Sequence, residues 1–482
     1  MTPEEELISL RQENKALREL LAIRDEQLSQ MQQQMTELLK QVQALQARLS
    51  KDSHNSHLPP SSDRFQRQPK SLRKKSEKKA GGQPGHDGNT LSLSKHPDQT
   101  IRYQVQQCEH CRYDLRRMAC VQEERRQVID LPPKRLVVIE HQTEQKCCPR
   151  CQRITATTFP EDVRAPVQYG PALGAVAVYL VQQQLLPYER ACETLQDLMG
   201  PAMTVGTLKA LVDRCAANLQ PIEVQIKDHL RQAKVMHQDE TGLYVMGKRH
   251  WMHVAATAAL THYAVHPKRG AEAVDAIGIL NGFRGVSVHD GWATYWKYAC
   301  EHALCNVHHL RELTFVFEEQ HQAWAGEMKR LLLAMNEAVK EAQQHGLRQL
   351  HPSELADWKA RYHAVLQAGE QANPLDPPPK EEAIKRGRRK QSTARNLLDR
   401  LSKHQDAVLL FLENFAVPFD NSRAERDIRM VKVQQKVSGC FRSSLGAEAF
   451  CRIRGYISTL HKQGAHVLTA LELAGHPVSP AF

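Results

Sequence analysis

A chain of 482 residues is long enough for about three domains, and its 65 Lys and Arg against 54 Asp and Glu give a net charge of +11, which favours a polyanionic partner. No apolar run reaches the roughly 18 residues of a membrane span, and the acidic start over residues 1–6 is unlike a signal peptide. We therefore expect a cytoplasmic protein whose 12 cysteines are thiols or metal ligands and not disulfides.

Residues 1–50 carry a heptad repeat. One heptad position holds Leu7, Asn14, Leu21, Leu28, Met35, Val42 and Leu49, and the position three residues later holds Leu10, Leu17, Arg24, Met31, Leu38 and Leu45. This a and d spacing predicts a leucine-zipper coiled coil, and Asn14 at an a position favours a parallel homodimer. The alternative is one amphipathic helix packed on its own globular domain.

Residues 51–100 change abruptly in composition. The segments 58–63 and 81–86, rich in Pro and Gly, cannot continue a helix, and the cations between them include Arg73, Lys74 and Lys75. We predict a flexible basic linker that contacts DNA phosphates. A solvated linker kept soluble by its charge is the alternative.

Two CxxC pairs lie in residues 101–156. Cys108 and Cys111 form the first pair, and Cys148 and Cys151 form the second. Two thiolate pairs of this kind are typical of a closed tetrahedral zinc site, which supplies folding energy and leaves no position open for catalysis. We predict a zinc-binding module with structural Zn²⁺, for which Cys147 and His110 are alternative ligands.

Residues 157–233 have a helical pattern. One helix is predicted from Pro187 to the break at Gly200 and Pro201, and Thr204 can cap the next. Two helices joined by a short turn are compatible with a DNA-binding helix-turn-helix. Because few basic residues lie nearby, an ordinary packed helical hairpin is an equal alternative.

Residues 234–317 alternate between strand and helix patterns. Residues 235–245 predict a β-hairpin with an acidic pair at its mouth; strands over 251–257 and 263–266, a helix over 271–280 and a strand over 285–289 follow. Three strands, a helix and a strand open a ribonuclease-H-like fold, in which the first and fourth strands are neighbours. Asp239 and Asp290 would then meet.

A third acid, Glu425, lies much later on a predicted helix. Carboxylate clusters are what Mg²⁺ requires, and two cations about 3.5–4 Å apart can activate an attacking oxygen and stabilise a leaving one. Asp239, Asp290 and Glu425 therefore predict phosphoryl transfer with two Mg²⁺ or Mn²⁺ ions. The pattern does not choose between Asp239 and Glu240, and an Asp before Gly at a strand end is also an ordinary turn.

Cys305 and His308 follow the last of these strands. A thiol and an imidazole at this spacing can begin a metal site, but they do not complete one. A buried thiol with a histidine at a helix start is the simpler interpretation.

The rest of the chain is predicted to be helical. A helical insertion occupies residues 318–410, the last helix of the core lies in residues 411–463, and residues 464–482 form a C-terminal tail. In the insertion, Met328, Leu331, Leu332, Met335 and Val339 recur at helix spacing, and the basic stretch 385–390 is either a DNA-facing loop or a solvated linker. On that last helix, Glu425, Arg429, Lys432 and Lys436 share one face. An acid for metal beside cations for phosphate suits a DNA strand at an active site, although an exposed helix with internal ion pairs is the alternative.

Several motifs of this sequence, and the order in which they occur, resemble those of the bacterial insertion-sequence-sixty-six family of DDE transposases. They are residues 58–63 and 81–86, the paired CxxC motifs, His237-Gln238-Asp239-Glu240-Thr241, Asp290-Gly291-Trp292 and residues 417–426. The resemblance covers nearly the whole chain. Ser422 stands where the family usually has a second Asn, and Arg112 follows the first CxxC where Gly is common.

This resemblance implies a catalytic triad of Asp239, Asp290 and Glu425. It also implies that Arg426 and Lys432 help to hold the transposon-end DNA, and that Cys305 and His308 match a Cys-x-x-His motif of several DDE families. A protein of this family is expected to be cytoplasmic and associated with the bacterial nucleoid.

The predicted fold is multidomain α+β: a coiled coil, a zinc-binding module, a helical DNA-binding region and a ribonuclease-H-like α/β core with a helical insertion. We predict a transposase that binds terminal inverted repeats and catalyses metal-dependent 3′-end cleavage and strand transfer. Its expected partners are DNA, further copies of the chain and accessory proteins of the same element. The alternatives are a zipper-dimerised DNA-binding regulator and a ribonuclease-H-like nuclease that does not join strands.

Overall fold

The structure is a computed structural model that describes residues 3–52, 54–56, 93–122, 124–129, 136–200, 203–375 and 391–475. It is a mixed α+β chain with two compact units. The larger unit comprises Met1–Lys70, Tyr169–Gln196 and Ala202–Phe482, and the smaller comprises Ser71–Gln168 and Asp197–Pro201. None of the helices among the described residues has the length and apolar character needed to cross a membrane.

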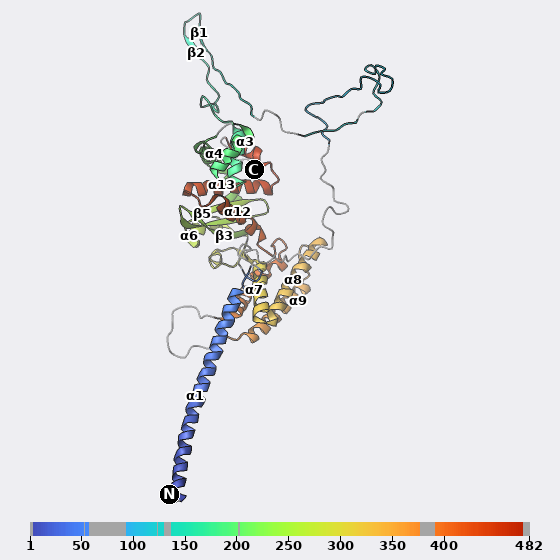
Figure 1. The fold of residues 1–482 in the computed structure, drawn as a ribbon. Coiled ribbons are helices and arrows are strands. Elements are labelled where there is room, and N and C mark those ends of the chain that lie inside the picture. The colour runs from blue at the N-terminus through green and yellow to red at the C-terminus, as the bar shows by residue number, and fades with distance from the viewer. Residues whose placement is uncertain are drawn as a thin grey trace. The chain divides into compact units, whose positions relative to one another are not determined.

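The first helix, α1 (Pro3–Leu49), is 47 residues long and confirms the predicted continuous helix (Figure 1). Its apolar side chains are exposed, with Leu21 at 59% and Leu38 at 61%. At its carboxyl end, Ser50 Oγ donates to Glu319 Oε2 over 2.7 Å, and the ammonium of Lys51 lies 4.9 Å from the ring centre of Phe315. Among the described side chains of α1, the apolar residues from Leu17 to Leu49 are therefore exposed, and the pairing of this helix into a coiled coil stays a prediction.

Four helices lie in the described residues between 171 and 231, just before the main sheet, and they confirm the predicted helical character of this region from residue 171 onward. They are α2 (Pro171–Gln182), α3 (Tyr188–Met199), α4 (Val205–Asn218) and α5 (Gln220–Arg231). Thr204 caps α4 as predicted, because its side chain accepts a hydrogen bond from the Thr207 N–H over 3.2 Å. Residues 157–170 hold no helix, which corrects the prediction, and Pro160, Pro166 and Gly170 explain the interruption.

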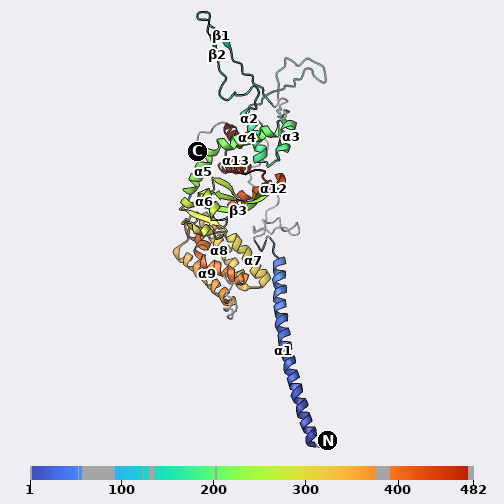
Figure 2. The ribbon, with the colours of Figure 1, turned by 90° about the vertical axis from the view of Figure 1, so that its left-hand side faces the viewer.

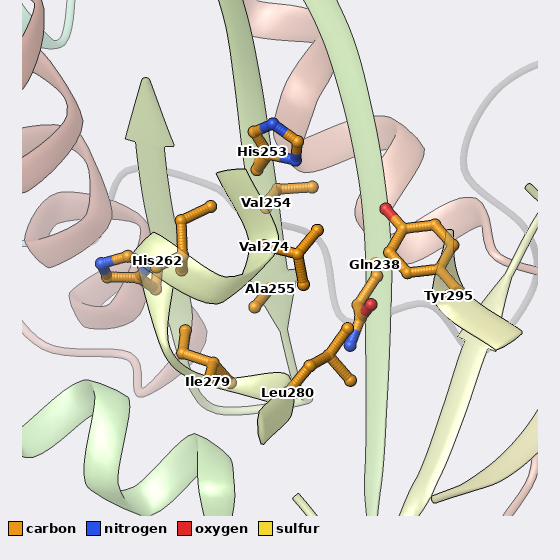
Figure 3. A pocket seen from close by; sticks show the side chains of 10 residues that line it. Gln238, His253, Val254, Ala255, His262, Val274, Ile279, Leu280 and Tyr295 are labelled. Carbon is orange, nitrogen blue, oxygen red and sulfur yellow. The ribbon is translucent and has the colours of Figure 1, made fainter. Parts of the chain in front are cut away.

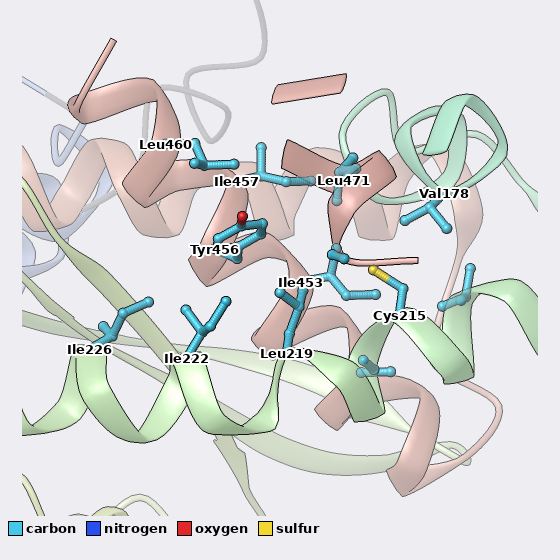
Figure 4. Packing of buried hydrophobic residues seen from close by; sticks show 14 of the residues in the cluster. Val178, Cys215, Leu219, Ile222, Ile226, Ile453, Tyr456, Ile457, Leu460 and Leu471 are labelled. Carbon is cyan, nitrogen blue, oxygen red and sulfur yellow. The ribbon is translucent and has the colours of Figure 1, made fainter. Parts of the chain in front are cut away.

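The apolar sides of α2, α4 and α5 share one core with α13 (Ser444–Lys462) and α14 (Val467–Leu473). In this core Ile222 and Ile226 of α5 lie close to Tyr456 and Ile457 of α13 (Figure 4). Burial of such side chains stabilises the larger unit by about 1.5–3 kcal/mol each. The helices before the sheet and those at the end of the chain thus form a single packed layer.

A five-stranded sheet lies at the centre of the larger unit. Its strands are β3 (Val235–Val245), β4 (Lys248–Ala256), β5 (Thr261–His266), β6 (Val286–His289) and β7 (Glu301–Leu304). Their order is β5-β4-β3-β6-β7. The pairs β3–β4 and β4–β5 are antiparallel, whereas β3–β6 and β6–β7 are parallel. The predicted neighbourhood of the first and fourth strands is confirmed.

The predicted position of the acidic pair at a hairpin mouth is wrong. Residues 235–245 form one continuous strand, and the turn to β4 falls at Met246 and Gly247, with φ of 52° and 72°. Positive φ at both positions matches a type I′ hairpin turn. Gly242 continues the strand, where it pairs with Trp251 of β4. Asp239 and Glu240 consequently lie in the middle of a paired strand.

Helices cover both faces of the sheet. Apolar residues of β3 and β4 pack with Ile428 and Val431 of α12 (Ser422–Ser438) and with Phe450 of α13. The other face receives α6 (Ala271–Ile277) and the 3-10 turn η2 (Leu280–Gly282). The helix predicted over residues 271–280 ends earlier, because Gly278 adopts φ of 71°. A second 3-10 turn, η3 (Tyr295–Lys297), follows β6.

The helical insertion has its own apolar core. Its helices, some of which extend beyond the predicted bounds, are α7 (Asn306–Gln320), α8 (Ala323–Gln344), α9 (Pro352–Ala372), α10 (Thr393–Lys403) and α11 (Gln405–Glu413). The predicted apolar face of α8 is confirmed, because Met328, Leu331, Leu332, Met335 and Val339 are all buried. Helices α8 and α9 lie side by side (Figure 2). The basic stretch 385–390 lies outside the described residues.

Candidate active site

The strand register brings two of the predicted acids together. In the parallel pair β3–β6, His237 lies opposite Val288. Asp239 lies two residues after His237 on β3, Asp290 follows the last residue of β6, and the charge of Asp290 acts on the Asp239 carboxyl group. Asp239 shares its face of β3 with Leu243 and Val245, whose side chains contact α12. That helix carries the third acid, Glu425, in its first turn.

Burial and neighbouring carboxylates raise the pKa values of Asp239 and Glu425. Burial raises the pKa of Asp239 well above its usual value, and the carboxylates of Glu240, Asp290 and Glu425 raise it further. Burial likewise raises the pKa of Glu425; Arg311 and Arg429 oppose this, whereas Asp420 and Asp290 add to it. Crowded carboxylates with raised pKa values are the donor set that a divalent cation stabilises. The residues present therefore fit Mg²⁺ or Mn²⁺.

Glu240, the alternative acid, already has protein partners. As the next residue on a strand, it points to the opposite face of the sheet, and its side chain is only 2% exposed. Arg269 Nε donates to its Oε1 over 3.0 Å, and the Tyr295 hydroxyl donates to Oε2 over 2.6 Å. The guanidinium of Arg269 also lies over the ring of Trp292 at 4.4 Å. This carboxylate is therefore engaged in holding the fold.

A small cavity lies behind β3 on the same face as Glu240 (Figure 3). Gln238, His253, Leu280 and Tyr295 are among its lining residues, and its volume is about 30 Å³. That volume is of the order occupied by a single water molecule. The cavity is therefore too small to hold a nucleotide.

Asn421 joins the elements that carry the acids, and sequence reasoning assigned it no role. It is 1% exposed, and its Oδ1 lies 2.9 Å from His237 Nδ1. Its Nδ2 donates to the Gln238 carbonyl over 2.7 Å, and its backbone N–H donates to Cys305 Sγ over 3.1 Å. One buried residue thus connects β3, the start of α7 and the start of α12. An asparagine before a helix suggests a cap, but this side chain makes no capping bond.

Glu425 lies close to Cys305 and His308. Its Oε1 is 4.0 Å from Cys305 Sγ and 3.8 Å from His308 Nε2. Among the residues that the structure describes, these three form the one group of three or more His, Cys, Asp or Glu side chains whose ligand atoms all lie within 4.8 Å. Burial raises the pKa of the Cys305 thiol to about 12. The thiol is buried before a helix, as the simpler interpretation expected, but it also has an acidic neighbour.

The predicted DNA-contacting cations of α12 differ in their surroundings. Lys432 Nζ donates to the Gly242 carbonyl of β3 over 2.7 Å, and burial and Arg249 lower its pKa. Arg426, Arg429 and Lys436 are exposed. Arg73, Lys74 and Lys75 of the predicted basic linker lie outside the described residues.

The two CxxC motifs of the smaller unit have the same local geometry. The Cys108 N–H donates to the Tyr113 carbonyl and the Cys148 N–H to the Arg153 carbonyl, each over 2.9 Å. The second motif lies in the turn between β1 (Gln145–Cys147) and β2 (Ile154–Ala156). The equivalent residues Arg112 and Gln152 have φ of 58° and 55°, a conformation that favours glycine.

Backbone donors within each motif favour the thiolate. The N–H groups of Cys111 and His110 lower the pKa of Cys108, and the corresponding groups of the second motif, led by Cys151, lower that of Cys148. The described structure does not gather the four thiols within 4.8 Å of one another. The zinc site therefore stays a prediction.

Comparisons with known proteins identify the family. Residues 2–92, which include α1, match a family of unknown function (DUF6444). No curated protein matches the chain. Residues 166–449, from just before α2 into α13, match the model described as the Transposase IS66 family. Because this match covers more than half of the sequence, the chain belongs to the IS66 family of transposases.

Proposed function

We propose that this chain is a DNA transposase that binds the terminal inverted repeats of its insertion sequence and catalyses metal-dependent 3′-end cleavage and strand transfer. The observation that carries this proposal is the parallel pairing of β3, which holds Asp239, with β6, which ends just before Asp290, together with the packing of α12, which holds Glu425, on β3. The strand order β5-β4-β3-β6-β7 supports the proposed ribonuclease-H-like core. The family match supports a transposase-type function.

Asp239, Asp290 and Glu425 would hold two Mg²⁺ or Mn²⁺ ions. When bound, such ions supply Lewis-acid stabilisation of the attacking and leaving oxygens of a phosphodiester. The contribution of the protein itself is to position the three carboxylates. Asn421 fixes the start of α12 against β3, and the ion pair of Glu240 with Arg269 supports β3 from the other face. In this proposal, the elements that carry the three acids are fixed in place before any DNA binds.

The cations of α12 would bind the DNA backbone beside the acids. Arg426, Arg429 and Lys436 are exposed on the helix that carries Glu425, and Arg429 acts on the Glu425 carboxyl through its charge. Such contacts position DNA without reading its sequence. Lys432, which is bonded to the β3 carbonyl in this structure, would have to exchange that bond for a phosphate. Arg73, Lys74 and Lys75 would add phosphate contacts from the linker.

The remaining regions would assemble the complex. In this proposal α1 pairs with the same helix of a second copy, since its exposed apolar stripe needs a partner. In this proposal, two regions contribute to end recognition: the zinc-binding module of residues 101–156, with Cys108, Cys111, Cys148 and Cys151 as ligands, and the helices α2 to α5. Accessory proteins of the same element complete the assembly.

The test uses the full-length protein and labelled DNA carrying the ends of its own element. We expect 3′-end cleavage and then joined products with Mg²⁺ but not with EDTA, and no cleavage by Asp239→Ala. Asp213→Asn, which changes an exposed acid on α4, is the matched control and should cleave normally. Cleavage that persists in Asp239→Ala would contradict the triad. Specific binding without cleavage, even with the other proteins of the element, would support a DNA-binding regulator.

A further inference from the structure

Glu425 lies between two different sets of donor atoms. One set holds the oxygen donors Asp239 and Asp290: the charge of Glu425 raises the pKa of Asp239, and the charge of Asp290 raises the pKa of Glu425. The other set holds a thiol and an imidazole: Cys305 Sγ at 4.0 Å and His308 Nε2 at 3.8 Å from Glu425 Oε1. The proposed DNA chemistry uses the first set and leaves the second unexplained.

The second set has the composition of a zinc site. Zn²⁺ binds sulfur at about 2.3 Å and nitrogen or oxygen at about 2.0–2.2 Å, so ligand atoms around a tetrahedral ion lie about 3.3–3.8 Å apart. The three atoms here all lie within 4.8 Å of one another, so that small side-chain movements would close the group on an ion. Mg²⁺ is a poor alternative, because it prefers an octahedral shell of oxygens.

The fold holds these ligands at a rigid junction. Cys305 is 1% exposed, its N–H donates to the His289 carbonyl of β6 over 2.9 Å, and its sulfur accepts the Asn421 N–H. His308 lies in the first turn of α7, and its N–H donates to the Cys305 carbonyl over 3.2 Å. The side chains of His308 and Glu425 are 16% and 24% exposed. An ion could therefore reach the group from solvent and keep a fourth position open.

We propose that Cys305, His308 and Glu425 form a binding site for a zinc-like divalent cation, and that its occupation withdraws Glu425 from Asp239 and Asp290. Zn²⁺ would then inhibit the Mg²⁺-dependent reaction by competing for a shared ligand. The site itself stands on the geometry of the three ligands. The inhibition rests on the proposed transposase function.

The first experiment measures binding without activity. Full-length protein is titrated with Co²⁺, whose visible bands and sulfur charge-transfer band report a thiolate ligand. Cys305→Ser keeps an acceptor for the Asn421 N–H but removes the thiolate, and Cys451→Ser changes another buried thiol, on α13, as the matched control. We expect wild type and Cys451→Ser to show about one equivalent of thiolate-bound Co²⁺ more than Cys305→Ser. The CxxC motifs contribute equally to all three proteins. Identical titrations of wild type and Cys305→Ser, with equal melting temperatures, would overturn the site.

The second experiment measures cleavage at fixed Mg²⁺ with increasing Zn²⁺. We expect the inhibiting Zn²⁺ concentration to rise about tenfold or more in Cys305→Ser, as typical for a weakened metal site, and to stay unchanged in Cys451→Ser. Equal sensitivity of Cys305→Ser and wild type would overturn the competition for Glu425. If wild type cleaves no DNA under any condition, the proposed function fails, and the Co²⁺ titration still decides whether the site exists.

Discussion

Metal-binding residues are proposed in two regions of this protein, and the two regions hold them in different ways. In the sheet, Asp239, Asp290 and Glu425 come from distant parts of the chain, and apolar packing together with Asn421 holds them in place. In the smaller unit, each CxxC pair is held by hydrogen bonds within its own turn. Apolar side chains around these turns are exposed, for example Tyr103 at 92% and Val138 at 90%.

The site in the sheet is formed by the fold of the larger unit. The site in the smaller unit would instead help that unit to fold when metal binds. The sheet can bring its carboxylates together at an electrostatic cost, because hydrophobic burial elsewhere in the larger unit supplies the free energy. The described part of the smaller unit has little buried apolar surface. We therefore expect a metal ion to be needed for its order, as in zinc fingers.

The largest expected effect is on catalysis in the sheet. Asp290→Asn removes one carboxylate charge while keeping the side-chain shape and its bond from the Trp292 N–H. We expect cleavage of element ends to fall about 10³-fold or more, equivalent to about 4 kcal/mol of lost transition-state stabilisation. End binding, measured by mobility shift, should change less than twofold. A parallel loss of binding would show that Asp290 is structural.

Metal removal should affect the smaller unit and leave the folding of the sheet in the larger unit unchanged. A chelator strong enough to strip Zn²⁺, or Cys148→Ser, should abolish amide-exchange protection in residues 136–156 and leave protection of β3 to β6 unchanged. Cys192→Ser, at a half-buried thiol of α3, is the control. Equal loss of amide-exchange protection in residues 136–156 and in β3 to β6, or no loss in either, would contradict the proposal that only the smaller unit needs metal to fold.

Asn421→Ala tests the buried connection in the larger unit. The substitution leaves the Gln238 carbonyl and the His237 ring without their partner, and unmade buried hydrogen bonds cost about 1–3 kcal/mol each. We expect the free energy of unfolding to fall by roughly 3 kcal/mol and cleavage to weaken with it. Asn396→Ala, which removes an exposed bond of α10, should change stability by less than about 0.5 kcal/mol. Similar losses in the two variants would show that Asn421 connects nothing essential.

Mild acid should destabilise the larger unit through its buried histidines. Burial lowers the pKa of His253 and His237 to about 4, whereas in the unfolded chain it is near 6.5. A lowered pKa in the folded state means that stability is lost as the pH falls below 6.5. At pH 5.5 each residue should cost about 1.4 kcal/mol relative to neutral pH. His253→Gln should reduce this loss in thermal melts, unlike His345→Gln on the surface; equal pH profiles would exclude His253 as a cause.

The parts of the fold that follow from local patterns could be predicted from the sequence. The heptad repeat gave α1, Thr204 gave the start of α4, and the period of the apolar residues gave the buried face of α8. The predicted order of strands and helices was sufficient to predict that the first and fourth strands, β3 and β6, are neighbours. Each of these features depends on spacing along one segment or on a short list of topologies.

The features that were missed depend on contacts between distant segments. The short strand β7 was not predicted, because four residues beside a larger sheet carry little pattern of their own. The bonds of Asn421 to His237 and Gln238 span more than 180 residues, and the distance from Cys305 to Glu425 spans 120. The roles of the acids and of the four CxxC thiols stay predictions, since no observation here tests them.

Strand β3 limits how this protein can change during evolution. Its odd-numbered residues face α12 and its even-numbered residues face Tyr295 and Arg269, so that Asp239 and Glu240 serve opposite sides of the sheet. Gain or loss of a single residue ahead of this pair would exchange the two sides at once. Lineages of this sequence should therefore accept substitutions along β3 far more readily than length changes, and insertions should accumulate in the connections outside the sheet.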